Sequence, residues 1–333
     1  MEELTERFGS LSVSLPQELR RALGHGVPYG EPAEAVLLHK GMMHGFPLSR
    51  LTELAEWEPV FQNAVFVLLV DRWQPAPRLG GLRSPLAWLG NQRALQPLKT
   101  YLGDIASGRF SGGRTVFIHI PKTAGTSIYE AARGHFHRSL LLGSHAELKS
   151  ATEHLPAYDF VAGHFTYDVA KKAMPGANFA TLLREPLSRL ASAAGHARRV
   201  GSRSRAPGMN LLREKTLKEF IEMPYGRSAL FMQNRFVAGI SGPAPASRLA
   251  AALDRVAAGT VDGMPGFLAR NRALLRIGPD EIARHNVTRD RNSLVPQEEI
   301  DEALAAHGDL IEEAGEIYRI VRSREIAAGS KRT

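Results

Sequence analysis

The amino-acid sequence predicts an α/β fold in which helices flank a central parallel sheet. Residues 115–120, 158–162 and 178–183 are apolar runs rich in β-branched or aromatic side chains, a composition that is typical of buried strands. Helical segments are expected after the first run, at 127–132, and after the third, in the Arg- and Ala-rich stretch that follows Pro186. Because parallel strands need a long crossover between them, this alternation of strands and helices predicts a parallel sheet.

The chain of 333 residues is long enough for one large α/β domain with a smaller attachment. We expect the main domain over residues 111–328, and a mostly helical extension of unknown role over residues 1–110. Within the extension, Ser14 and Pro16 are typical of a helix start with a hydroxyl cap and an early proline. The apolar run 64–70 suits either a strand or a buried helix, and its periodicity does not decide between them.

Further helices are expected towards the C-terminus, around residues 210–223, 246–258 and 296–327. The last of these carries apolar side chains at helical spacing, which predicts a helix packed along one side against the domain. We expect Gly308 to bend or break it.

Charge and composition restrict the kinds of ligand and compartment. The net charge is +8, from 42 Lys and Arg against 34 Asp and Glu, which favours anionic ligands such as phosphates, nucleotides or acidic glycans. No helix-turn-helix, zinc-finger or aromatic RNA-binding pattern accompanies the charge, so nucleic acid is not an expected partner. The chain has no cysteine, no N-terminal secretory pattern and no apolar run of the roughly 20 residues that a membrane helix needs. A soluble, cytoplasmic protein is the expectation.

The segment between the first strand and the first helix has the composition of a phosphate-binding loop. Backbone N–H groups at a helix start, together with the helix dipole, attract anions. Lys122 adds a positive charge, Gly125 permits close backbone approach, and hydroxyl groups follow directly. The residues expected to hold the anion are Pro121, Lys122, Thr123, Ala124, Gly125, Thr126 and Ser127.

The order of residues in this loop differs from that in the NTPase P-loop. In that loop a lysine directly precedes Ser or Thr and follows a Gly-x-x-x-x-Gly run. Here Lys122 comes before Gly125, so the hydroxyl that would bind Mg²⁺ beside the lysine is not in its usual place. A nucleotide-anion site without a metal is therefore expected.

Two motifs resemble those of a known family. Residues 117–127, Phe-Ile-His-Ile-Pro-Lys-Thr-Ala-Gly-Thr-Ser, are similar to the 5′-phosphosulfate loop of carbohydrate sulfotransferases that use 3′-phosphoadenosine 5′-phosphosulfate (PAPS), particularly the uronyl and heparan 2-O group. Residues 184–192 are similar to that family's 3′-phosphate motif, Arg-Asp/Glu-Pro-x-x-Arg-x-x-Ser. The resemblance implies a P-loop-containing nucleotide hydrolase-like fold, with Arg184 and Ser192 binding the 3′-phosphate.

A third match suggests the general base. Residues 163–167, Gly-His-Phe-Thr-Tyr, look like the Gly-His-x-x-Tyr segment of the 2-O-type enzymes, which implies that His164 is the catalytic base. A neutral imidazole at a strand end is suited to accept a proton from a sugar hydroxyl. His119 is the rival candidate. The relatives carry a further histidine two residues before the base, where this chain has Ala162.

The resemblance continues more loosely downstream. Residues 232–239 are similar to the family's Gln-x-Arg-x-x-Ala-Gly segment, and residues 286–291 look like a late basic loop, which would add Thr288 and Arg289 to the nucleotide site. After Ser192 the family often has aromatic residues, whereas this chain has Ala193-Ala194-Gly195-His196.

The resemblance therefore implies a sulfotransferase that moves a sulfuryl group from PAPS to a hydroxyl and releases adenosine 3′,5′-bisphosphate. The expected acceptor is a glycan or glycoconjugate. His164 would act as base and Lys122 would stabilise the leaving phosphate. Two alternatives stay open: a P-loop kinase-like phosphotransferase that uses ATP, and a non-catalytic nucleotide- or glycan-binding protein. Arg198, Arg199 and the basic segment 202–208 suit either a solvated surface or a groove for an acidic ligand. The acceptor and the oligomeric state are not indicated.

Overall fold

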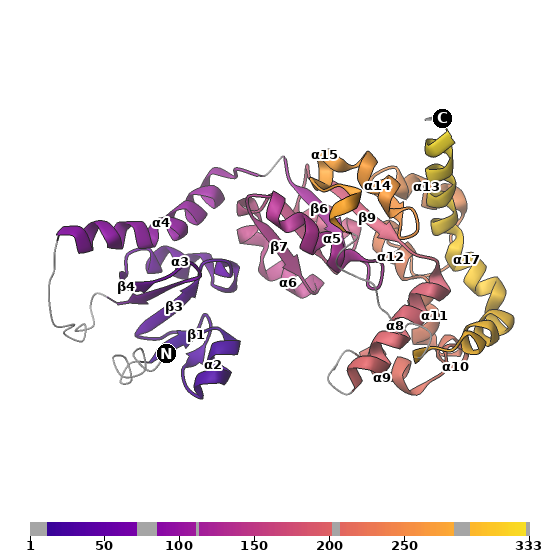
Figure 1. Ribbon diagram of the computed structural model, residues 1–333, viewed down its shortest axis with the longest axis horizontal. Helices are drawn as coiled ribbons and strands as arrows, with labels where there is room; N and C mark the ends of the chain where they lie inside the picture. The colour runs from indigo at the N-terminus through magenta and orange to yellow at the C-terminus, as the bar shows by residue number, and fades with distance from the viewer. Residues whose placement is uncertain (1–11, 72–84, 111–112, 202–206, 283–293, 331–333) are drawn as a thin grey trace. The chain divides into compact units, whose positions relative to one another are not determined.

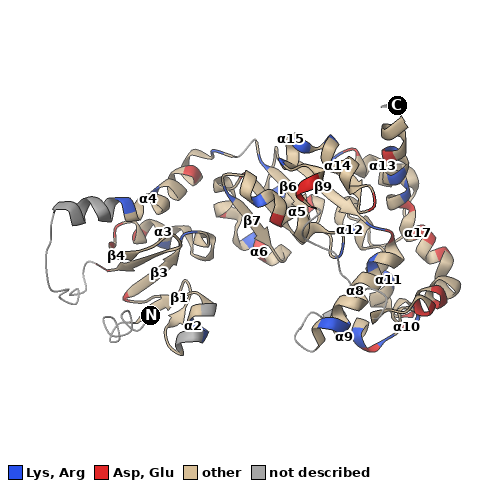
Figure 2. Ribbon diagram, in the orientation of Figure 1, with Lys and Arg blue, Asp and Glu red and all other residues tan. Residues whose placement is uncertain are grey.

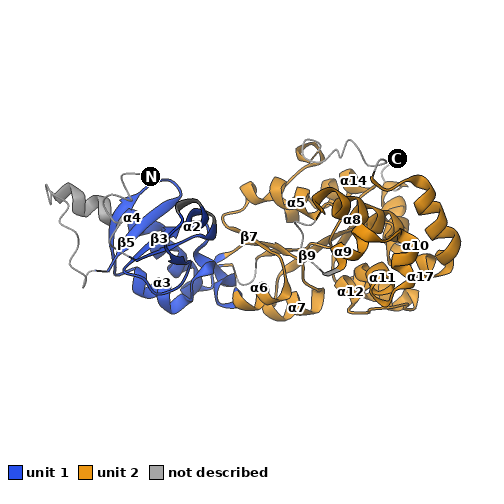
Figure 3. Cartoon of the chain, turned by 90° about the horizontal axis from the view of Figure 1, so that it is seen from below, with its two compact units in different colours: residues 1–109, 151–157 blue, residues 110–150, 158–333 orange. Residues whose placement is uncertain are grey.

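The computed structural model describes residues 12–71, 85–110, 113–201, 207–282 and 294–330. The chain forms two compact units (Figure 3). The first unit comprises residues 1–109 together with 151–157, and the second comprises residues 110–150 and 158–333. The short segment 151–157 is therefore part of the first unit although it lies between two strands of the second, which no sequence feature indicated.

The second unit is built on a five-stranded sheet in the order β10-β9-β6-β8-β7. Three of its strands, β6, β7 and β9, are labelled in Figure 1. Every neighbouring pair in this sheet is parallel, as the sequence predicted. The strands are β6 (Thr115–Ile118), β7 (Ser139–Leu142), β8 (Phe160–Gly163), β9 (Asn178–Leu183) and β10 (Ala257–Thr260). Both edge strands, β7 and β10, were missed in the sequence, because Ser-Leu-Leu-Leu and Ala-Ala-Gly-Thr contain no β-branched or aromatic run like those of β6 and β8.

The order of the strands brings three strand ends together near the middle of the sheet. Strand β6 lies between β8 and β9, and Ile118 is in register with Gly163 on one side and with Thr181 on the other. The chain first leads from β6 out to β7, and after β8 it passes to β9 on the opposite side of β6. In open parallel sheets, ligands bind beyond the carboxyl ends of the strands at the point where the strand order reverses. Here that point is the end of β6.

Helices cover the sheet and supply the core. Strand β6 is buried along its whole length, as expected for a parallel strand covered on both faces. One cluster of buried side chains joins the sheet to three helices, α5, α14 and α15. It includes Phe117, Phe160, Leu182, Ile128, Phe267 and Leu275.

A second cluster of buried side chains lies around α8, α10, α11 and α17. The helices of the second unit follow in chain order. Their bounds are α5 (Gly125–Ala132), η2 (Arg133–His135), α6 (His145–Ser150), α7 (Tyr167–Ala173), α8 (Pro186–Val200), α9 (Pro207–Glu214), α10 (Leu217–Glu222), α11 (Pro224–Leu230), α12 (Met232–Ala238), α13 (Ala246–Leu253), α14 (Met264–Arg270), α15 (Arg272–Leu275), η5 (Pro279–Glu281) and α17 (Gln297–Ser330). Helix α17 is kinked at His307, where φ is −135° and ψ is 25°, directly before the glycine expected to bend it.

The first unit differs from the mostly helical extension that the sequence predicted, because it contains a five-stranded sheet in the order β2-β1-β3-β5-β4. The ambiguous apolar run forms a strand, β5, which pairs antiparallel with β3 and β4. Strands this short show no periodicity until a partner strand is present. The elements are β1 (Val13–Leu15), α2 (Gln17–Leu23), β2 (Val27–Pro28), β3 (Ala35–His39), η1 (Met43–Gly45), α3 (Leu48–Leu54), β4 (Glu58–Gln62), β5 (Phe66–Val70), α4 (Pro85–Ser107) and η3 (Thr152–Ala157).

The predicted start of the first helix is correct for the proline and wrong for the hydroxyl cap. Helix α2 begins directly after Pro16, and no side chain caps it. Ser14 belongs to β1 instead, where its hydroxyl donates to the carbonyl of Pro28 at 3.1 Å and accepts from the amide of Gly30 at 3.2 Å. Among the described helices, none is long and apolar enough to cross a bilayer.

Candidate functional site

The loop after β6 has an unusual backbone. Lys122 and Ala124 have positive φ values of 70° and 64°, and they are two of the three non-glycine residues with this property in the described part of the chain. Thr123 between them is fully buried, and its hydroxyl donates to the carbonyl of Ile120 at 2.9 Å. Left-handed conformations cost non-glycine residues about 1–3 kcal/mol each and are concentrated at functional sites. The loop therefore has the backbone of a binding loop rather than of an ordinary strand-to-helix turn.

Helix α5 begins directly at the end of this loop without a side-chain cap. Its N-cap residue is Ala124, which has no polar group to offer the first amides. By contrast, α8 is capped by Glu185, whose carboxylate accepts from the amides of Leu187 at 2.9 Å and Ser188 at 2.6 Å. An anion near the start of α8 would meet a carboxylate, whereas one near the start of α5 would meet the positive end of the helix dipole.

The two hydroxyl groups predicted at the helix start lie in different surroundings. Thr126 is exposed, whereas Ser127 is only 2% exposed. Pro121 and Lys122 are half-buried beside them. The surface of the loop is thus presented by Lys122 and Thr126, and Ser127 belongs to the interior of α5.

His164 follows β8 and is linked to the loop by its ring. Its Nδ1 lies 2.6 Å from the carbonyl oxygen of His119. A carbonyl oxygen can only accept, so Nδ1 must carry the hydrogen, and in the neutral ring Nε2 is then the basic nitrogen. The two histidine rings are 4.4 Å apart between centroids. This contact sets the tautomer that a general base acting through Nε2 requires.

His119 itself is enclosed. Its side chain is packed against Gly125, where an added Cβ would lie 1.9 Å from the ring. Burial, together with the nearby charges of His164 and Lys122, lowers the pKa of His119 to about 3. A ring that is buried and neutral down to such acidity is a poor general base near neutral pH. These observations favour His164 over His119 for that role.

The low pKa of His119 predicts that the fold loses stability in acid. In the unfolded chain the histidine binds a proton below about pH 6.5, whereas in the folded protein it does so only near pH 3. Between these values the unfolded state holds more protons, so the free energy of unfolding falls as the pH falls, by about 3 kcal/mol at about pH 4. Urea unfolding of the wild type and of His119→Ala across this range should show a shallower pH dependence in the variant. An unchanged slope would contradict a buried neutral His119, and His135→Ala, an exposed histidine, is the control.

Arg184 directly follows β9, and its position is set by a second buried side chain. The amide of Gln233 donates to the Arg184 carbonyl at 2.7 Å, and its oxygen accepts from the Arg184 backbone N–H at 2.8 Å. The guanidinium of Arg184 in turn donates to the carbonyl of Lys122 at 3.4 Å. Two motifs that are 62 residues apart in sequence thus meet at the carboxyl ends of β6 and β9. The alternative that Arg184 pairs with Glu185 is not favoured, because that carboxylate caps α8.

The side chains of α8 continue along the same region. Ser192 is half-buried in the middle of the helix. One turn further, the pKa of His196 is lowered by burial and then by the charge of Lys122, so this face of α8 lies near the loop. The resemblance predicted a role for Ser192 but none for His196.

Other matched positions serve packing. Tyr167 is buried, with its ring 4.9 Å from that of Phe179 and the guanidinium of Arg255 4.5 Å from its centre. Gly239 ends α12 with a left-handed φ of 71°, as glycine commonly does at a helix C-terminus. Gln233 lies in a segment that resembles the family, but the sequence assigned it no role. Its buried side chain hydrogen-bonds to the backbone of Arg184, which only the structure shows.

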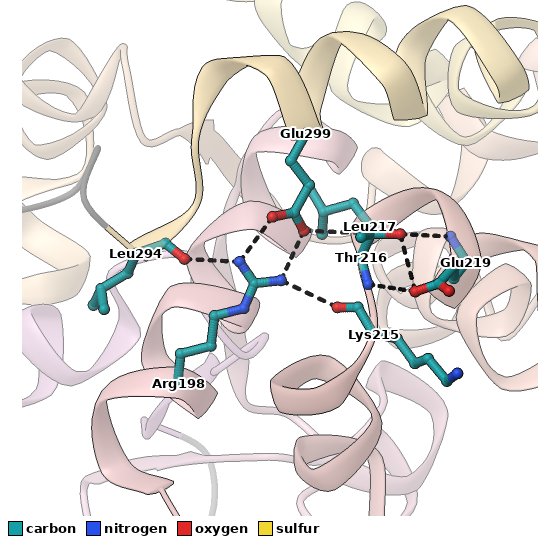
Figure 4. Close-up of polar contacts among 7 residues, drawn as sticks. All are labelled: Arg198, Lys215, Thr216, Leu217, Glu219, Leu294 and Glu299. Atoms are coloured by element: carbon teal, nitrogen blue, oxygen red, sulfur yellow. Dashed lines mark hydrogen bonds and ion pairs between the residues drawn. The ribbon is translucent and has the colours of Figure 1, made fainter.

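The sequence left two roles open for Arg198, and the structure does not support the first of them, a solvated surface residue. Its guanidinium binds the carboxylate of Glu299 with two hydrogen bonds, of 2.7 and 2.8 Å, and donates to the carbonyls of Leu294 and Lys215 (Figure 4). The hydrogen bonds and charge of Glu299 raise the pKa of Arg198. Glu299 lies in the acidic first turn of α17 (Figure 2), so this ion pair joins α8 to α17 and is structural.

Several predicted residues are not part of this geometry. Thr288, Arg289 and the segment 202–206 lie outside the described residues. A surface groove of about 660 Å³ is lined by the amino-terminal ends of β6, β9 and β10, at the opposite end of the strands from the loop. Within the described ranges, no group of three or more His, Asp or Glu side chains could hold a metal ion.

The comparisons with known proteins give no match. No protein-family model matches the chain, and neither a curated protein nor a solved structure matches it. Function is therefore inferred from the residues and contacts described above.

Proposed function

We propose that this protein is a sulfotransferase that moves a sulfuryl group from PAPS to a hydroxyl of a carbohydrate acceptor. The observation that carries the proposal is that three motifs lie at adjacent strand ends: the loop after β6, His164 after β8 and Arg184 after β9. A hydrogen bond from Arg184 to the carbonyl of Lys122 links the first and third of them. Each motif was matched separately in the sequence, and nothing in their spacing required that they meet. Convergence at the carboxyl ends of parallel strands is typical of nucleotide sites.

The residues present suit a donor that carries negative charge at both ends. The uncapped N-terminus of α5, with Lys122 beside it, offers a site for the 5′-phosphosulfate. Arg184, held by Gln233, offers a forked donor to the 3′-phosphate, and Ser192 lies on the helix that follows. When bound, PAPS would supply the sulfuryl group: the acceptor oxygen bonds to sulfur, the bond from sulfur to the 5′-phosphate oxygen breaks, and adenosine 3′,5′-bisphosphate leaves.

The proton chemistry is assigned to His164. Its Nδ1–H is committed to the carbonyl of His119, so Nε2 accepts the proton of the acceptor hydroxyl as the oxygen attacks. Lys122 stabilises the negative charge that develops on the departing phosphate. The buried ring of His119 holds the loop and the base in one packed unit. Thr126, on the exposed side of the loop, donates to the 5′ end of the donor.

A titration of the full chain tests the donor. We expect adenosine 3′,5′-bisphosphate to bind at least about tenfold more tightly than ADP, with no requirement for Mg²⁺, because the site is built for a 3′-phosphate. In the variant Arg184→Gln the Kd for adenosine 3′,5′-bisphosphate should rise by about tenfold or more. Arg227→Gln, an exposed arginine on α11, is the matched control and should bind like the wild type.

Calorimetry separates the alternatives as well. Preference for ADP with Mg²⁺ would overturn the proposal in favour of an ATP-dependent phosphotransferase. Tight binding of adenosine 3′,5′-bisphosphate without transfer of radiolabelled sulfate from PAPS to any of a panel of polysaccharides, lipids and phenols would favour a non-catalytic binding protein.

A further inference from the structure

We infer that Arg189 is a positioning residue for the 3′-phosphate end of this site. It fixes the turn between α11 and α12, and this turn places Gln233 where it hydrogen-bonds to the backbone of Arg184. The inference rests on the proposed function and adds to it the residue that makes the site selective for a 3′-phosphate. Arg189 lies in α8 between Arg184 and Ser192, the two residues expected to contact that phosphate.

Arg189 is enclosed to a degree that is rare for arginine. Its side chain is 1% exposed, and it is the largest of the fully buried side chains in the described part of the chain. The guanidinium donates to the carbonyl of Ala229 and lies 3.5 Å from the sulfur of Met232. Its Nε–H has no hydrogen-bond partner among the residues that the structure describes. Arginine is almost never fully buried unless it is paired, so its presence here needs a reason.

The charge of Arg189 is not neutralised by an ion pair. No carboxylate lies within 4.0 Å of it among the described residues. Burial and, to a smaller extent, the charge of Arg235 lower the pKa of Arg189 to about 10, although Glu185 acts in the opposite direction. Glu185 in turn directs both carboxylate oxygens to the first amides of α8. A buried positive charge without a counter-charge is costly, and a bound phosphate nearby would compensate it.

The contacts of Arg189 connect it to Arg184 through the turn between α11 and α12 and through Gln233. Ala229 and Met232 lie at the end of α11 and the start of α12, so the guanidinium holds the turn between these helices. Gln233 follows Met232 directly and makes both hydrogen bonds to the backbone of Arg184. From Arg184 the chain returns within one turn of α8 to Arg189. Loss of the Arg189 contacts should therefore loosen the grip on Arg184.

The first variant to test is Arg189→Met, which fills similar volume without charge or donors. We expect the Kd for adenosine 3′,5′-bisphosphate to rise by about tenfold or more, with the Kd for adenosine 5′-phosphate changed by less than about twofold. A residue that only packs the core would change the stability of the fold without changing the ratio of these two constants. Arg114→Met is the matched control, because Arg114 is 3% exposed, donates to the carbonyl of Phe110 and lies before the opposite end of β6. The control should leave the ratio unchanged.

Two further variants keep the test decisive if Arg189→Met does not fold. Gln233→Leu removes the grip on Arg184 directly and should cause the same loss of selectivity. Arg189→Lys keeps the charge without the fork and should lose selectivity in part. In the double variant of Arg189→Lys with Gln233→Leu, the losses of selectivity from the two substitutions should not add, because both act through Arg184.

The outcomes separate this inference from the proposed function. Equal weakening of both nucleotides, or an unchanged ratio in Arg189→Met and Gln233→Leu, would refute the positioning role while leaving the donor site intact. Failure of the wild type to prefer adenosine 3′,5′-bisphosphate over adenosine 5′-phosphate would refute the donor site itself.

Discussion

Replacement of His164 by alanine is expected to lower the rate of sulfuryl transfer by about 10²–10⁴-fold, the usual contribution of a general base. Binding of adenosine 3′,5′-bisphosphate should stay within about twofold of the wild type, because in the proposed mechanism His164 acts on the acceptor hydroxyl and not on the charged ends of the donor. The rate is measured as transfer of radiolabelled sulfate from PAPS to the polysaccharides of the acceptor panel. The binding constant is measured by calorimetry.

Two companion variants separate proton transfer from structure. His164→Asn keeps an N–H that can donate to the carbonyl of His119 but has no basic nitrogen, so it should be as inactive as the alanine variant. His135→Ala removes an exposed histidine that pairs with Glu281 and should keep full activity. Transfer at the wild-type rate in His164→Asn would show that another group accepts the proton.

The rival base is tested in the same assay. His119→Ala removes the packed ring but keeps the backbone carbonyl that orients His164, so the variant should lose clearly less activity than His164→Ala if His164 is the base. A loss as large as that of His164→Ala, in a variant that still binds adenosine 3′,5′-bisphosphate, would transfer the role to His119.

The second large effect is expected in the candidate phosphate-binding loop, residues 121–127, which we call the donor loop. In Gly125→Ala the new Cβ would lie 1.9 Å from the His119 ring, and that ring is enclosed and cannot withdraw without moving the loop. We expect a loss of about 2–3 kcal/mol in the free energy of unfolding, together with a loss of adenosine 3′,5′-bisphosphate binding of about tenfold or more. Urea unfolding and calorimetry measure the two effects.

A second substitution should reverse the first. In the double variant Gly125→Ala with His119→Ala the collision is absent, and the coupling energy between the two sites should recover more than about 1 kcal/mol of stability. Gly134→Ala, close behind on the same segment, meets no atom within 4 Å and should be nearly neutral. Additive effects of the two substitutions would mean that the ring and the glycine are not in contact.

Both predictions depend on one arrangement around His119. Its carbonyl sets the tautomer of His164, and its ring fills the space that Gly125 leaves open. The donor loop and the candidate base are therefore parts of one packed unit. A change in the loop should for that reason affect proton transfer as well as binding.

Part of this molecule follows from local sequence. The strands around residues 115–118 and 178–183 and the long C-terminal helix were predicted because their apolar patterns are strong and local. Residues 121–127 were predicted to be a phosphate-binding loop from the order of their residues, because Lys122 supplies charge and Gly125 leaves space at a fixed spacing. The first unit was misjudged as mostly helical, because strands of two to five residues become recognisable only when they pair.

The sequence by itself determined the residue types of the candidate site: a lysine and glycine at a helix start, a histidine after one strand and an arginine after another. Only the tertiary structure decided that β8, β6 and β9 lie side by side and bring these residues together. It also revealed that Arg198 joins α8 to α17, that Gln233 holds Arg184, and that Arg189 is buried without an ion-pair partner in the described part of the chain. The physical reason is that strand order, burial and long-range hydrogen bonds arise from packing between distant segments, whereas local sequence controls only conformation and chemical type.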